Sequence, residues 1–124
     1  MTTEGTPSLE DISSFEIHQD TAGLGMTVFY DGVAFTSDIP EDLAEGTAAL
    51  WGTFASDSAV ASVVDDASDV RSGASALRFD TASGFDTGLV FPKAGAGQTH
   101  WDLSDVRSVV LWIHPVNSNP VQFQ

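Results

Sequence analysis

The sequence predicts an all-β fold, an antiparallel β-sandwich, from three observations. Apolar and polar residues alternate over several short segments, which is typical of strands with one buried and one exposed face. These segments follow one another at a steady spacing and are separated by turns rich in glycine, aspartate and serine. Long helical patterns do not alternate with them, which argues against a parallel α/β sheet.

The first three expected strands follow in chain order. Residues 13–18 alternate, with a phenylalanine and an isoleucine on one face. Residues 26–30 alternate in the same way, and the strand resumes at residues 33–35 after an expected turn or bulge at Asp31-Gly32. Residues 59–64 are mostly apolar and rich in β-branched side chains, which favour strands.

Three more strands are expected in the second half of the chain. The first lies around Leu77 and Phe79, and the second is the short apolar run 89–91, closed by Pro92. The third, Ser108–His114, is apolar on both faces, so it is buried on both sides or has a second face that binds something.

In the last of these strands the uniformly aliphatic set should face the core. That set is Val109, Leu111 and Ile113. The other face then directs Trp112 and His114 outward, beside Val110.

One segment is a candidate helix. Pro40 stands at a first-turn position of residues 40–50, and Glu41 and Asp42 lie near the positive end of the helix dipole. The same acidic composition fits a linker, so both interpretations stay open.

Composition excludes several classes of function. Of the 124 residues, 42% are hydrophobic, which is enough for a core. With 18 acidic and 4 basic residues, the net charge of −14 argues against nucleic-acid binding and against adhesion to anionic membranes. No apolar run approaches the ~20 residues of a membrane-spanning helix, so membrane insertion is not expected. The chain has no cysteine, which excludes disulfides and thiolate chemistry.

The acidic residues are biased toward aspartate. Thirteen of the 18 are aspartate, and Lys93 is the only lysine. Short carboxylates keep a surface hydrated when salt screens charge. The bias fits a halophilic protein from a saline setting and equally an ordinary acidic secreted domain.

Two stretches of the chain resemble a known family. The segments Ser75-Ala-Leu-Arg-Phe79, Trp101-Asp-Leu-Ser-Asp105 and Leu111-Trp-Ile113 resemble the first half of a galactose-binding-like jelly-roll module, the kind found in carbohydrate-binding modules. The segments Ile12-Ser-Ser-Phe-Glu-Ile17 and Val28-Phe-Tyr-Asp-Gly-Val-Ala-Phe35 resemble its last two strands.

Because the end of a module precedes the start of one, the resemblance implies an incomplete fragment across a junction of two tandem modules. Residues 1–38 would hold the last strands of one module, residues 39–49 a linker or short helix, and residues 50–124 the first part of the next. The alternative is one circularly permuted module without its middle strands. Neighbouring modules of the same polypeptide are then expected partners.

The resemblance also implies a structural calcium ion. In many such modules an aspartate of the last strand contributes to a calcium site, and Asp31 stands at that position. The alternative for Asp31 is an Asp-Gly turn. Asp65 and Asp66, with Asp69, form a second acidic group that could hold a cation, although a solvated acidic turn explains it as well.

Aromatic residues are the candidate ligand contacts. Trp112 with His114, Trp51 and Tyr30 could form platforms on which the C–H face of a pyranose packs. The alternative is that these side chains fill the core of the sandwich. Trp101 is expected to be a structural plug before a turn.

The predicted function is a non-catalytic carbohydrate-binding module that binds a polysaccharide or glycan. No Gly-x-Ser-x-Gly elbow or HExxH motif is present, so the chain is not expected to be an enzyme. The resemblance implies a larger secreted or cell-surface protein, hence an extracellular location. Two alternatives are a structural spacer or adhesion repeat without a small-molecule ligand, and an accessory region of a secreted hydrolase or peptidase.

Overall fold

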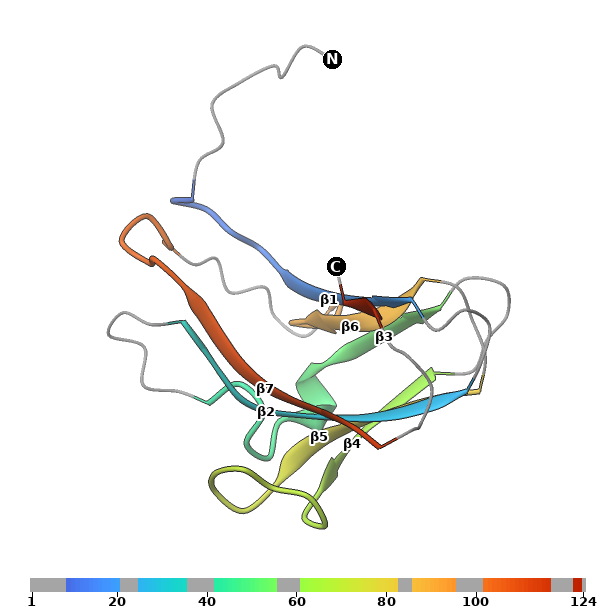
Figure 1. The fold of residues 1–124 in the computed structure, drawn as a ribbon. Coiled ribbons are helices and arrows are strands. Elements are labelled where there is room, and N and C mark those ends of the chain that lie inside the picture. The colour runs from blue at the N-terminus through green and yellow to red at the C-terminus, as the bar shows by residue number, and fades with distance from the viewer. Residues whose placement is uncertain are drawn as a thin grey trace.

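A computed structural model of the chain describes residues 9–20, 25–35, 42–55, 61–82, 86–95, 102–116 and 122–123. Trp101 lies outside these residues. Two antiparallel sheets pack face to face as a β-sandwich, which confirms the predicted fold class (Figure 1). The strands are β1 Phe15–Asp20, β2 Met26–Phe35, β3 Gly52–Ala55, β4 Ala61–Asp66, β5 Ala76–Thr81, β6 Thr87–Phe91, β7 Val109–Pro115 and β8 Gln122–Phe123.

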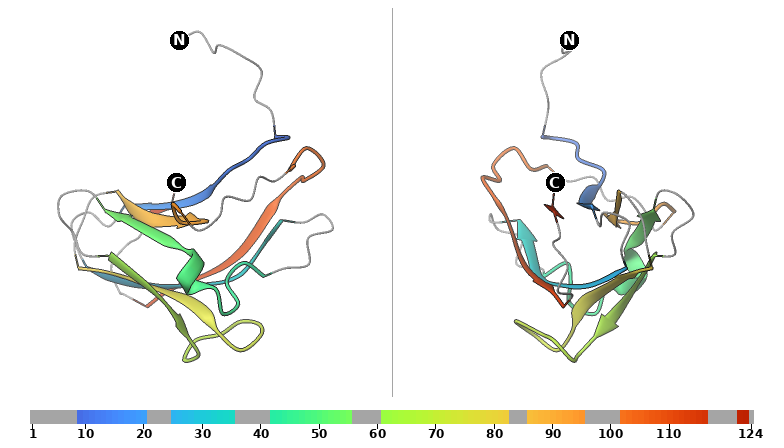
Figure 2. Two further views of the ribbon diagram at one scale, coloured as in Figure 1. Left: turned by 180° about the vertical axis from the view of Figure 1, so that it is seen from behind. Right: turned by 45° about the vertical axis from the view of Figure 1, so that its right-hand side comes forward.

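The strand orders are β3-β6-β1-β8 in one sheet and β4-β5-β2-β7 in the other. We call them the upper and the lower sheet, from their places in Figure 1. β2 is bowed, with its hollow turned toward the upper sheet (Figure 2). Of the described strands, β3 had no counterpart among the expected ones, because its four residues are too few to show alternation.

The sheets do not follow the expected division into two modules. β1 lies between β6 and β8, and β2 lies between β5 and β7, so in each sheet a strand from residues 1–38 lies between strands from residues 50–124. Within this structure the two segments therefore form one sandwich. The physical reason is that the inward faces of β1 and β2 are apolar and bury their area against the later strands.

The core lies between the sheets and contains aliphatic and aromatic side chains from both. Its large fully buried members, all with no exposed area, are Val28, Tyr30, Val33, Leu77, Phe79 and Leu89. These positions alternate along their strands with outward side chains, as expected for a sandwich.

The segment expected to be a linker or short helix packs into this core. Leu43 and Ala44 are buried, and the N–H of Leu43 donates to the carbonyl of Val33 at 2.8 Å. The carboxylate of Asp42 accepts from the N–H groups of Val33 and Ala44, which fixes a turn where a helix was considered. Only the short 3₁₀ helix Ala48–Leu50 follows.

No helix among the described residues is long and apolar enough to cross a membrane.

Candidate functional site

The candidate site lies on the outer face of the lower sheet, turned away from the upper sheet. Directly paired residues of antiparallel strands point to the same face. Phe29 of β2 pairs with Arg78 of β5 and with His114 of β7, so these three side chains form one row across the sheet. The neighbouring row pairs Asp31 with Trp112.

The outward direction of Trp112 and His114 follows from their neighbours on β7. Leu111 and Ile113 pack against the core, so the intervening Trp112 and the following His114 point away from it. This confirms the predicted facing of four positions on β7. Val110, 50% exposed, is also outside the core.

Val109 is the exception in the set expected to face the core, because it is 39% exposed and is not part of the core cluster. It lies at the start of β7, which is an edge strand of the lower sheet.

Trp112 and His114 form an aromatic pair on the outer face. Their ring centroids are 5.5 Å apart, with the planes tilted by 50°. Trp112 is partly exposed, and the His114 side chain is 48% exposed. The Nδ1 of His114 contacts the carboxylate of Asp69, which ties β7 to the loop after β4.

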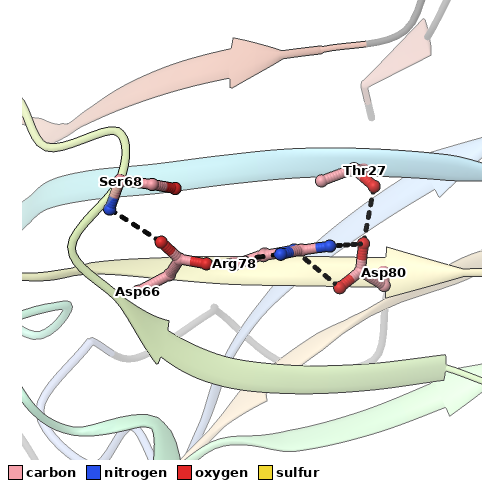
Figure 3. Close-up of polar contacts among 5 residues, drawn as sticks. All are labelled: Thr27, Asp66, Ser68, Arg78 and Asp80. Carbon is pink, nitrogen blue, oxygen red and sulfur yellow. Dashed lines mark hydrogen bonds and ion pairs between the residues drawn. The ribbon is translucent and has the colours of Figure 1, made fainter.

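Arg78 is held between two carboxylates in the middle of the same face. Its Nε lies 2.9 Å from Asp80, and its Nη1 lies 3.4 Å from Asp66 (Figure 3). Thr27 of β2 donates its hydroxyl proton to Asp80 at 2.5 Å. Hydrogen bonds from the side chain and then from the N–H of Ser68, followed by the contact with Arg78, lower the pKa of Asp66.

An open cavity lies between this charged group and the loop after β4. Its volume is about 370 Å³, within the range of small-molecule sites. Phe29, almost completely buried, and Val116, which is exposed, are its apolar part, and Asp69 and Arg78 are its charged part. The full lining is Thr27, Phe29, Ser68, Asp69, Arg78 and Val116.

Asp31 was a candidate calcium ligand, and in the structure its carboxylate accepts hydrogen bonds from backbone N–H groups. It is completely buried, and Oδ2 accepts from the N–H groups of Arg71 and Ser72 at 2.6 and 2.8 Å. Oδ1 accepts from the N–H of Gly32 at 2.7 Å, within a bulge of β2. Gly32 has a φ of 59°, which favours glycine at this position.

The carboxylates of Asp65 and Asp66 also bond to other groups of the protein. Asp65 accepts from the N–H of Ala48, and Asp66 pairs with Ser68 and Arg78. The described residues contain no group of three or more acidic or histidine side chains that could hold a metal ion. Asp31, Asp65 and Asp66 are therefore bonded to groups of the protein itself, and calcium binding, which needs six to eight oxygen ligands, stays a prediction.

Trp51 and Tyr30 were candidate sugar platforms, and the structure places both in the core. Trp51 is 3% exposed, packs on Phe91 with centroids 5.0 Å apart, and donates its indole N–H to the carbonyl of Leu43. Tyr30 is completely buried, because position 30 faces the upper sheet. Neither can contact a ligand at the surface, and the candidate contacts that remain are Trp112 and His114.

Phe29, Arg78 and Asp80 were not predicted as site residues, and Asp69 was considered only as part of an acidic group with Asp65 and Asp66. Alternation along β2 places Phe29 on its outward face, and this is the only signal in the sequence that points to Phe29 as a site residue. The contact of Asp69 with His114 joins residues 45 positions apart, and no local pattern predicts it.

Comparison of the chain with protein-family models, with curated proteins and with solved structures found no match.

Proposed function

We propose that this chain is a non-catalytic carbohydrate-binding β-sandwich and that a glycan binds the outer face of the lower sheet. The observation that carries the proposal is Trp112, a partly exposed tryptophan on a sheet whose phenylalanine and tyrosine side chains are almost entirely buried. An aromatic ring in this position offers an apolar surface to the C–H face of a pyranose.

Polar groups on the same face as Trp112 supply the second requirement of sugar recognition. The carboxylates of Asp69 and Asp80 accept hydrogen bonds, as their contacts with His114 and Thr27 show. β5 and β7 are separated by β2, so about 10 Å, twice the usual strand spacing, separates Arg78 from His114. A glycan chain laid across the sheet would contact both the aromatic pair and the charged group.

A spacer without a ligand is the second candidate. It is favoured by the burial of Trp51 and Tyr30, since this leaves one tryptophan of the described residues at the surface. An extracellular location in a larger protein is part of both proposals and rests on the resemblance of the sequence.

Affinity electrophoresis in gels containing soluble β-glucan, xylan, galactan or galactomannan tests the proposal. At least one polymer should retard the protein, and Trp112→Ala should abolish the retardation while stability falls by less than ~1 kcal/mol, as for an exposed site. Leu50→Ala, which removes an exposed apolar side chain outside this face, is the matched control and should bind normally.

Two results would contradict the proposal. One is no retardation by any polymer, which favours the spacer. The other is a stability loss of roughly 3–5 kcal/mol for Trp112→Ala, which is the cost of removing a large buried aromatic.

A further inference from the structure

The charged groups of the outer face indicate which class of glycan binds there, and this inference rests on the proposed function. Four carboxylates lie on this face or on the loop beside it, against two guanidinium groups. The carboxylates are those of Asp31, Asp66, Asp69 and Asp80, and the guanidinium groups are those of Arg71 and Arg78.

The guanidinium in the middle of the face is already neutralised. Arg78 makes ion pairs with Asp66 and Asp80 at 3.4 and 2.9 Å. A carboxylate or sulfate of a ligand would have to displace one of these partners and would then meet its negative charge. The chain as a whole adds to this repulsion with its net charge of −14.

Two of these carboxylates, those of Asp69 and Asp80, suit an uncharged sugar. Hydroxyl groups of a pyranose donate to ionised carboxylates, which are strong acceptors. Asp80 already accepts from a hydroxyl of the protein, that of Thr27. Asp69 lines the cavity beside the aromatic pair and lies where a sugar packed on Trp112 would extend.

We propose that the outer face binds a neutral glycan and excludes glycans that carry carboxylate or sulfate groups. The exclusion comes from Asp66 and Asp80, which neutralise Arg78 through three of its five N–H groups and repel an acidic ligand that approaches it. Removing both carboxylates should therefore convert Arg78 into a binding site for an acidic glycan.

The experiment compares each neutral polymer of the panel with its carboxymethylated derivative. For the wild-type chain, carboxymethylation should weaken retardation at least about fivefold at low salt, and the difference should shrink at about 1 M salt, where the Debye length is about 3 Å. The double variant Asp66→Asn/Asp80→Asn should bind the carboxymethylated polymer at least about fivefold more tightly than wild type at low salt.

A matched control removes two carboxylates from the upper-sheet side. Glu16→Gln/Asp86→Asn makes the same change in net charge next to His18, away from the outer face. It should change binding of the carboxymethylated polymer less than about twofold. If both double variants bind the carboxymethylated polymer more tightly by the same factor, the exclusion comes from the net charge of the whole molecule. That result would overturn the role of Asp66 and Asp80.

The outcomes separate this inference from the function on which it rests. If the neutral polymers bind and their carboxymethylated derivatives bind equally well, the exclusion is wrong and the carbohydrate-binding function stands. If no neutral polymer binds, the carbohydrate-binding function fails first.

Discussion

Removing the carboxylate of Asp31 should destabilise the fold strongly, because this side chain anchors the loop after β4 to the bulge of β2. Three backbone N–H groups, those of Gly32, Arg71 and Ser72, donate to it at 2.6 to 2.8 Å. The contact joins positions 40 and 41 residues apart and fixes the loop that carries Asp69.

The magnitude follows from these three bonds. A hydrogen bond contributes about 1 kcal/mol net, and more when the acceptor is charged, so Asp31→Ala should lower the free energy of unfolding by about 3–5 kcal/mol. An asparagine keeps one acceptor oxygen, which can serve the two donors of the loop. Its NH₂ group then faces the N–H of Gly32, so Asp31→Asn should cost about 2 kcal/mol.

Urea unfolding at pH 7 in the presence of EDTA measures both variants without any contribution from calcium. Asp65→Asn is the control, since Asp65 is exposed and accepts from one N–H group, that of Ala48. It should cost less than about 1 kcal/mol. An Asp31→Ala loss below about 1 kcal/mol in EDTA, or a loss that occurs only when calcium is present, would refute the anchoring role.

Two further predictions concern single side chains of β1 and β2. The hydroxyl of Tyr30 is buried without a hydrogen-bond partner among the described residues, and burial raises its pKa. Tyr30→Phe should therefore leave the free energy of unfolding unchanged or raise it by about 1 kcal/mol. A clear loss of stability in urea unfolding would show that the hydroxyl has a partner. Contacts with Glu16 and then Asp86 raise the pKa of His18, which favours its charged form in the folded state. This stabilisation is complete below the ordinary pKa of about 6.5 and is lost as pH rises through the raised value. Unfolding between pH 6 and 8 should therefore show a decline in stability that is smaller in His18→Gln, and equal slopes would contradict it.

Local alternation was sufficient to predict most strands and the facing of β7. Leu111 and Ile113 face the core and Trp112 faces outward, as a period of two requires. β-pairing partners lie far apart in sequence, so the pairing of β1 with β6 and the single sandwich could not be predicted from local pattern.

The site was harder to predict than the fold. Trp51 and Tyr30 carry the same chemistry as Trp112, and only the packing of the sheets distinguishes the buried rings from the partly exposed one. Asp31 satisfies backbone donors of a loop about 40 residues away, and its sequence context is that of an Asp-Gly turn. Its role therefore depends on tertiary contacts that no local motif encodes.

The central claim is that glycan contacts Trp112 on the outer face of the lower sheet. The most direct measurement is an NMR titration of the tryptophan indole N–H signals with an oligosaccharide of the polymer that retards the protein, with Trp112→Ala used for assignment. We predict that the Trp112 signal shifts in a saturable way, together with His114, while the indole of Trp51, bonded to the carbonyl of Leu43 in the core, stays in place. Saturable shifts confined to the upper sheet, with the Trp112 signal unmoved, would contradict the account.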